Sequence, residues 1–249
     1  MPVFNEPMPR RTMVLFFLVD ASSSMEGGKI GAVNDAIRNV LPMVNDISVN
    51  NNYAEIRVAV LKFSSGVELV YSEPKLASEF EWLDIQAAGL TDMGEACREL
   101  SSKLSRSAFM KSEGGFYAPA VILMSDGHPT DDFAAGLNSL KRNKWFMKGI
   151  RVAIAIGNDA DKDALAQFCL DKEGVFDVHD IESLRRVIRL VAVTSSQIGS
   201  QSTTAADTTK QKKVIDAITK GIAENKAEQG EDGTQNPAEP PKDNWNDWD

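Results

Sequence analysis

Hydrophobic and polar positions along the first 190 residues form short blocks with two different periods. Four blocks are continuous or alternating apolar runs of strand length, rich in the β-branched and aromatic residues that strands favour. These predicted strands are Met13–Val19, Ile56–Phe63, Val121–Met124 and Ile150–Ile156. The chain is therefore expected to return to one sheet at least four times.

Helical patterns occupy the stretches between these strands. Between Ile30 and Val44 the apolar residues fall at steps of three and four, which places them on one face of a helix. Similar patterns predict further helices over Gly94–Leu104, Phe133–Leu140, Ala160–Leu170 and Ile181–Val191. Strands that alternate with helices predict a mostly parallel sheet with helices on both of its faces.

The segment "FSSGVELVY" adds an antiparallel element to this arrangement. A Ser-Ser-Gly turn follows Phe63, and the alternating side chains Val67, Leu69 and Tyr71 follow the turn, which predicts a hairpin. We therefore predict an α/β fold with a doubly wound, mostly parallel sheet of the Rossmann-like kind and one antiparallel edge strand.

The character of the chain changes around Thr194. The segment "TSSQIGSQSTTAADTTKQKK" is rich in Ser, Thr and Gln, which predicts a linker. A short amphipathic helix is predicted at 211–225 from four apolar residues at helical spacing: Val214, Ile215, Ile218 and Ile222. The residues that follow this helix predict an acidic, flexible and disordered tail.

The last six residues, "NWNDWD", place Trp245 and Trp248 among acidic side chains. Two interpretations stay open: tail residues of no consequence, or a short motif that binds a partner protein through the two indoles. We expect three parts along the chain: an N-terminal extension at 1–11, a folded domain at 12–196, and a C-terminal region at 197–249.

Charge and cysteine content narrow the function classes. The 249-residue chain has a formal net charge of −9, so neither a nucleic acid nor an anionic membrane is the expected partner. The apolar run from Met13 to Val19 is far shorter than the roughly 20 residues of a membrane-spanning helix, and no signal-peptide cleavage site follows it. Cys97 and Cys169, the only cysteines, lie far apart, which disfavours a disulfide framework. We expect a cytoplasmic protein with two reduced thiols.

The first predicted strand ends in "VDASSSMEGGKI", where Asp20, Ser22 and Ser24 alternate. Gly28-Lys29 suggests a nucleotide-binding loop, but Ser23 stands in place of its first glycine and Ile30 in place of its final hydroxyl residue. A serine nucleophile would need a histidine base, for which the sequence offers only His128 and His179. It would also need a Gly-x-Ser-x-Gly elbow, which the sequence lacks. Helix capping explains one such residue but not three at alternate positions.

A divalent metal site explains the alternation better. Asp20 comes at the carboxyl end of a predicted strand, Thr91 precedes a predicted helix, and Asp126 ends the apolar strand "VILM". Ligands of doubly wound sheets bind outside the carboxyl ends of the strands, where the strand order reverses. With Ser22 and Ser24, these residues offer two carboxylates and three hydroxyls, an all-oxygen set that suits a hard cation.

The pattern Asp20-x-Ser22-x-Ser24, then Thr91, then Asp126 resembles the metal-ion-dependent adhesion site of von Willebrand factor A domains. The resemblance covers roughly residues 10 to 196. Within that superfamily, "FLVDASSSMEGGKIGAVNDAI" and "LMSDGHPTDD" are most similar to bacterial intracellular members of the TerY type, which are associated with tellurium resistance and stress. The chain departs from many of these relatives in having Ala and Ser where they carry Thr and Gly.

The resemblance implies that these five residues hold Mg²⁺, with Mn²⁺ or Ca²⁺ as alternatives. Because the serine and threonine ligands are neutral, the ion keeps much of its positive charge and binds a carboxylate of a partner protein at an open coordination position. For a TerY-like system, the implied partner is a kinase or a phosphatase, and the chain itself is a non-enzymatic binding module.

A metal-dependent phosphoester hydrolase is the alternative function. The sequence argues against it, because we find no candidate general base, no second metal cluster and no phosphate-cradling lysine near the site. We expect His128 to lie at the rim of the site, and Asp131 and Asp132 to be charges at helix starts.

Overall fold

The computed structural model describes residues 9–201 and 207–231 of the chain. Seven strands in this part form one sheet: β1 (Arg11–Asp20), β2 (Ala54–Ser64), β3 (Gly66–Leu69), β4 (Lys75–Leu76), β5 (Ala120–Ser125), β6 (Ile150–Ile156) and β7 (Val175–Val178). The α-helices of the same part are α1 (Gly28–Val49), α2 (Met93–Lys103), α3 (Phe133–Lys141), α4 (Lys144–Lys148), α5 (Lys162–Cys169), α6 (Ile181–Gly199) and α7 (Asp207–Glu231). None of these helices has the length and apolar content needed to cross a membrane.

The order of the strands confirms the predicted fold class. The sheet runs β3-β2-β1-β5-β6-β7, and the two-residue β4 also pairs with β2. β1, β2, β5, β6 and β7 are parallel, whereas β3 is antiparallel to β2 at the edge, as the hairpin pattern predicts. The short β4 and β7 were not predicted from the sequence. The order reverses at β1, which has β2 on one side and β5 on the other, so the switch point lies between β1 and β5.

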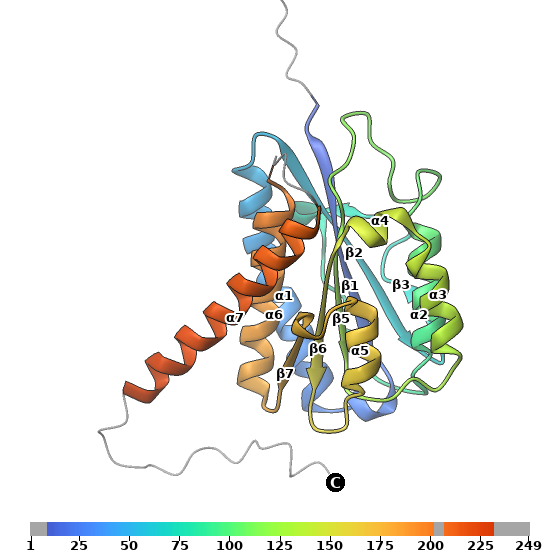
Figure 1. Cartoon of the computed structure of the whole chain (residues 1–249), viewed down its shortest axis with the longest axis vertical. Helices are drawn as coiled ribbons and strands as arrows, with labels where there is room; N and C mark the ends of the chain where they lie inside the picture. Colours follow the sequence, from blue (N-terminus) through green and yellow to red (C-terminus); the bar gives the residue numbers. More distant parts are fainter. Residues whose placement is uncertain (1–8, 202–206, 232–249) are drawn as a thin grey trace, which may run out of the picture.

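The two faces of the sheet are covered by different helices (Figure 1). Along β1, the odd-numbered side chains from Met13 to Val19 pack in one layer with α1, α6 and α7. The even-numbered side chains from Val14 to Leu18 pack in the other layer with α2, α3, α4 and α5. Because neighbouring side chains of a strand point to opposite faces, a strand buried on both faces reads as one continuous apolar run.

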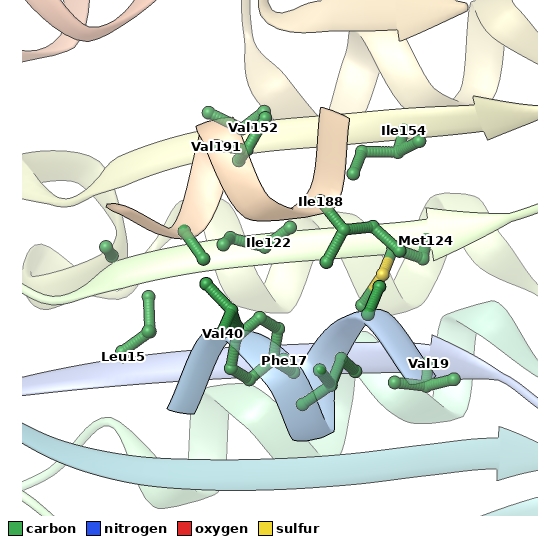
Figure 2. Packing of buried hydrophobic residues seen from close by; sticks show 14 of the residues in the cluster. Leu15, Phe17, Val19, Val40, Ile122, Met124, Val152, Ile154, Ile188 and Val191 are labelled. Carbon is green, nitrogen blue, oxygen red and sulfur yellow. The ribbon is translucent and has the colours of Figure 1, made fainter. Parts of the chain in front are cut away.

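Figure 2 shows how the first of these layers is filled. Side chains from β1, β5 and β6 meet α1 and α6: Leu15, Phe17, Val19, Ile122, Met124, Val152, Ile154, Val40, Ile188 and Val191. Each fully buried side chain of this size contributes about 1.5–3 kcal/mol of transfer free energy. This packing fixes the relative positions of β1 and β5, whose carboxyl ends carry the candidate site.

The linker predicted from Thr194 onward does not begin there. α6 continues to Gly199, and Ser195, Ser196 and Gly199 are buried. A Cβ atom on Gly199 would lie only 2.5 Å from the Cε atom of Met13, so α6 passes close to β1 here, and a larger residue would force the end of the Met13 side chain to move. The linker interpretation was wrong for these residues, because small side chains at a close helix contact have the same composition as a flexible linker.

The helix predicted at 211–225 lies within α7, which packs against α6 and the sheet. Its apolar residues Val214, Ile215 and Ile218 are buried. Gln211 makes a second kind of contact: its side chain accepts from the backbone N–H of Arg151 and donates to the backbone carbonyl of Arg151, both at 2.8 Å. Pairing between β6 and β7 begins only at Ala153, so Gln211 takes the place of a strand partner for Arg151.

We expect Gln211→Ala to destabilise the folded chain by about 2 kcal/mol, because it leaves the buried N–H and C=O groups of Arg151 unpaired. Urea unfolding at equilibrium measures this loss. Lys212→Ala is the matched control, since Lys212 is an exposed neighbour on the same helix. A Gln211→Ala variant as stable as the Lys212→Ala variant would show that the side chain does not secure α7.

Candidate metal centre

The candidate metal centre lies at the switch point of the sheet. Asp20 is the last residue of β1, and Asp126 directly follows β5. β1 and β5 are parallel neighbours, with Val19 opposite Met124, so both carboxylates emerge at the same edge. Asp20 and Asp126 are 0% and 1% exposed. Two buried carboxylates thus lie where ligands of this fold class bind.

The loop after β1 folds its serines back toward Asp126. The backbone N–H of Ser22 donates to Asp20 Oδ1 at 2.9 Å, and a single 3₁₀ turn, η1 (Ser23–Met25), follows. This turn brings Ser22 Oγ and Ser24 Oγ to 3.0 Å from each other. Ser24 Oγ in turn donates to Asp126 Oδ1 at 2.7 Å. Hydrogen bonds therefore connect four of the five predicted ligand residues.

Thr91, the fifth predicted ligand residue, reaches the same place from the loop before α2. An ideal Cβ atom on Gly127 would lie 3.6 Å from Ser24 Oγ and 3.8 Å from Thr91 Oγ1, so both hydroxyls lie close to one point. The loop is held by a reciprocal pair of bonds: Thr91 N–H donates to Thr130 Oγ1, and Thr130 N–H donates to the Thr91 carbonyl, both at 2.9 Å. Thr130 thereby connects the loop before α2, which carries Thr91, to the segment that carries Asp126.

Neighbouring aspartates position these loops and do not join the cluster. Asp92 Oδ2 accepts from the N–H of Gly66 at 2.8 Å and so anchors the β2–β3 turn. Asp132 caps its own helix, α3, by accepting from Ala135 N–H. Asp131 accepts from two amides at the start of α2 instead. Both therefore occupy helix starts, as predicted, although Asp131 serves a helix that precedes it in the chain.

Two residues that the sequence analysis did not assign also belong to the cluster. Ser125 Oγ donates to Asp20 Oδ2 at 2.5 Å. Lys29, in the first turn of α1, lies with its Nζ 2.6 Å from Asp126 Oδ2. A lysine therefore does lie at the site, although its contact here is with a carboxylate, and the expectation that no phosphate-cradling lysine is present stays a prediction. The sequence does contain a signal for this contact, because a lysine at a helix start five residues after Ser24 can fold back over that loop.

Burial controls the ionisation of Asp20. Removal from water raises the pKa of this carboxyl from 3.8 to about 6, against the hydrogen bonds from Ser125 and Ser22, which lower it. The nearby charge of Asp126 raises the pKa further, as the smallest of these effects. A positive charge in the cluster would favour the ionised form of Asp20 and so offset the cost of burying it.

The donor set fits a hard divalent cation. Two carboxylates and three hydroxyls converge, and all the donor atoms are oxygen, as Mg²⁺, Mn²⁺ and Ca²⁺ prefer. Among the described residues, no group of three or more His, Cys, Asp and Glu side chains forms a metal cluster elsewhere. The hydroxyl-rich set is thus the candidate metal centre of the described chain.

The remaining predicted residues lie apart from this cluster. The side chain of His128 is 73% exposed, and its Nδ1 lies 2.9 Å from Asp161 Oδ2, which agrees with a place at the rim. Trp245 and Trp248 lie outside the described residues. Their predicted role in partner binding stays a prediction.

Known structures share this fold. Proximal thread matrix protein 1 from the mussel byssus, solved with a zinc-occupied MIDAS motif, matches with a TM-score of 0.59 and 18% identity over 76% of this chain and 48% of that chain. A von Willebrand factor type A protein from Catenulispora acidiphila matches with a TM-score of 0.55 and 18% identity over 75% and 43%. The pilus adhesin SpaC from Lactobacillus rhamnosus GG matches with a TM-score of 0.60 and 14% identity over 76% and 31%.

This chain spans less than half the length of each of these three proteins, and their low identities establish the fold alone. No curated protein matches the sequence. The family model for the von Willebrand factor type A domain matches residues 15–190, which is more than half of the chain. The protein therefore belongs to the von Willebrand factor type A domain family.

Proposed function

We propose that this protein is a non-enzymatic module that binds another protein in a divalent-metal-dependent manner. Domains of this family are typically interaction modules, and similar structures include matrix and adhesin proteins. The observation that carries the proposal is the convergence of Asp20, Ser22, Ser24, Thr91 and Asp126 at the switch point of the sheet.

The residue types of the centre explain why it would attract an anion. Ser22, Ser24 and Thr91 contribute neutral oxygens, so only Asp20 and Asp126 oppose the charge of a 2+ ion. Ser24 Oγ is hydrogen-bonded to both Ser22 Oγ and Asp126 Oδ1, so Asp126 would help to hold the ion in part by orienting the Ser24 hydroxyl. A bound ion would supply one coordination position for an anionic oxygen. An Asp or Glu of a partner protein is the group that we propose for that position.

We propose Mg²⁺ as the ion, because hard oxygen ligands and neutral hydroxyls suit it, with Mn²⁺ or Ca²⁺ as alternatives. Zinc in the mussel protein occupies the MIDAS motif of that protein and does not decide the ion used here. Calorimetric titration with each of these ions ranks them directly.

We infer the class of partner from the similarity of two sequence segments, "FLVDASSSMEGGKIGAVNDAI" and "LMSDGHPTDD", to TerY-type proteins. On that basis the protein serves a bacterial intracellular system of the tellurite and stress type, in the cytoplasm, and its partner is a kinase or phosphatase of the same system. The net charge of −9 supports a protein partner over a nucleic acid or an anionic membrane. Trp245 and Trp248 are proposed as a further contact with that partner.

We expect partner capture to be lost when the metal is removed. In a pull-down with the full chain as bait, a partner retained in Mg²⁺ should be released by EDTA, and substitution of its critical Asp or Glu should have the same effect. A Trp245→Ala/Trp248→Ala variant separates the tail contact from the metal contact. Binding that persists undiminished in EDTA would show that another surface is used and that the exposed-cation mechanism is wrong.

The phosphoester hydrolase remains the second candidate, because two observations favour it. Lys29 places an ammonium group at the site, and Asp161 orients His128 at the rim. No second metal cluster accompanies them in the described residues. The discriminating measurement is turnover of a generic phosphoester in Mg²⁺ or Mn²⁺. Turnover that disappears in Asp126→Ala would favour the hydrolase.

A further inference from the structure

The side chain of Lys29 lies inside the candidate metal centre. Its Nζ donates to Asp126 Oδ2 at 2.6 Å and to the backbone carbonyl of Ser24 at 3.2 Å. The Lys29 side chain is 15% exposed and the Asp126 side chain is 0% exposed. Because the pair is shielded from solvent, salt and water screen its attraction much less than that of a surface ion pair.

The fold aims this ammonium at the carboxyl ends of the strands. Lys29 is the second residue of α1, which follows the serine loop. An ideal Cβ atom on Gly157, just after β6, would lie 3.9 Å from Lys29 Nζ. The side chain thus extends from α1 across the ends of β5 and β6, where its head meets Asp126. The helix start adds partial positive charge on the same side.

Lys29 and a metal ion would therefore both interact with the carboxylate of Asp126. Asp126 is one of only two negatively charged ligands in the candidate set, and its Oδ2 is already paired with a cation. A 2+ ion close to Asp126 either displaces the ammonium from Oδ2 or stays within a few ångströms of a like charge. Both arrangements cost free energy that an isolated carboxylate would not require.

We propose that Lys29 is a tethered cation that competes with the divalent ion for Asp126 and so lowers the ion affinity of the centre. This inference rests on the proposed function, in which Asp126 helps to hold the ion. Lys29 has a positioning role here and is not a ligand. It holds the serine loop and the end of β5 together when no ion does so, and it sets the ion concentration at which the centre becomes loaded.

The change in ion affinity when Lys29 is removed distinguishes competition with the ion from a merely structural role. If Lys29 only held the loop in place, its removal would disorder the serines and weaken ion binding. If Lys29 competes with the ion, its removal frees Asp126 and strengthens ion binding, while the protein without ion becomes less stable, because a buried carboxylate has lost its partner.

The test is calorimetric titration of the full chain with Mg²⁺ and with Mn²⁺ at constant pH and ionic strength. We expect Lys29→Met to bind each ion about tenfold more tightly than the wild type. Lys29→Gln, which keeps a polar head that can donate to Asp126 without charge, should shift in the same direction. Lys29→Arg, which keeps the charge, should stay near the wild-type affinity.

Lys103→Met is the matched control. Lys103 forms an ion pair with Glu99 on α2, and its side chain is 24% exposed, so this variant removes the same charge from a partly shielded pair away from the centre. Its ion affinity should equal that of the wild type. Thermal unfolding gives a second readout: Lys29→Met should melt lower than the wild type in EDTA and gain more from saturating Mg²⁺.

Equal or weaker ion binding by both Lys29→Met and Lys29→Gln would overturn the competition, provided that the wild type binds the ion and Asp126→Ala does not. A wild type that binds no divalent ion, or an Asp126→Ala variant that binds as tightly as the wild type, would overturn the proposed function instead. The two failures are therefore distinguishable in the same set of titrations.

Discussion

Asp126→Ala is expected to abolish binding of Mg²⁺ and Mn²⁺ at the candidate centre. The substitution removes one of the two carboxylates of the candidate set and the acceptor of the Ser24 hydroxyl, so the centre loses negative charge and the serine loop loses an anchor. Loss of a residue that only supports a ligand typically costs 10–100-fold in metal affinity, so we expect a loss of about 100-fold or more here. Asp20→Ala should have a similar effect. Calorimetric titration measures both.

The fold should survive Asp126→Ala, because Asp126 directly follows β5 and is not part of either hydrophobic cluster of the core. The variant does leave the ammonium of Lys29 without its carboxylate, which costs stability. An Asp126→Ala/Lys29→Met double variant removes both charges and should recover that stability without recovering metal binding. Asp177→Ala, at an exposed carboxylate paired with Lys162, controls for the loss of one negative charge. Unchanged ion affinity in Asp126→Ala would remove the basis of the metal-site assignment.

The parts of the fold that could be predicted are those in which local pattern and tertiary environment agree. β1 is buried on both faces, so its continuous apolar run from Met13 to Val19 already identifies a central strand. The positions of Asp20 and Asp126 follow from the same pattern, because each directly ends or follows such a strand. Parallel strands bring their carboxyl ends to one edge, so the clustering of the two residues was predictable without side-chain detail.

Other features depend on contacts that no local pattern contains. Gln211 completes the edge of β6 from the first residue of a predicted helix, and nothing in the local pattern shows that its side chain pairs with Arg151. Asp131 caps a helix that precedes it by about forty residues. β7 has only four residues, too few for its alternation to stand out. In each case the residue or strand contacts a partner that is distant in the sequence and close only in the folded chain. A local sequence pattern therefore does not identify that partner.

Lys29 shows the same limit within the site itself. A lysine at the start of a helix is most often solvated, and a sequence alone does not show which carboxylate its flexible side chain reaches. The structure places its Nζ on Asp126, across an interval of 97 residues. The clustering of the predicted ligand residues was therefore accessible from the sequence, whereas the pairing of Lys29 with Asp126 was not.

Asp20→Asn is expected to stabilise the protein at neutral pH when metal is chelated. Burial raises the pKa of Asp20 from 3.8 to about 6, so the folded state holds its proton more tightly than the unfolded state does. Asp20 carries no penalty at about pH 3 and below, where it is protonated in both states. The penalty grows as the pH rises from about 3 through 6 and then stays constant. A shift of this size corresponds to about 3 kcal/mol at pH 7.5.

Asparagine is neutral throughout this range and avoids that penalty. It can keep one of the two acceptor contacts of Asp20, with Ser22 N–H or Ser125 Oγ, so part of the gain is lost to an imperfect hydrogen bond. We therefore expect Asp20→Asn to be more stable than the wild type by about 1–2 kcal/mol at pH 7.5 in EDTA, with the difference falling to zero near about pH 5 and reversing at lower pH, where only the cost of the imperfect hydrogen bond remains. Urea unfolding across this pH range gives the comparison, and Asp177→Asn, at an exposed site, serves as the control.

Saturating Mg²⁺ should reverse the order of stability of these two proteins. The wild type gains free energy of folding in proportion to the logarithm of the ion concentration relative to its dissociation constant. Asp20→Asn lacks a carboxylate of the centre and gains little, so its advantage in EDTA becomes a deficit in Mg²⁺. If Asp20→Asn is less stable than the wild type at pH 7.5 in EDTA, then the buried carboxylate is not a cost to the fold. A bound cation would then have no such cost to offset.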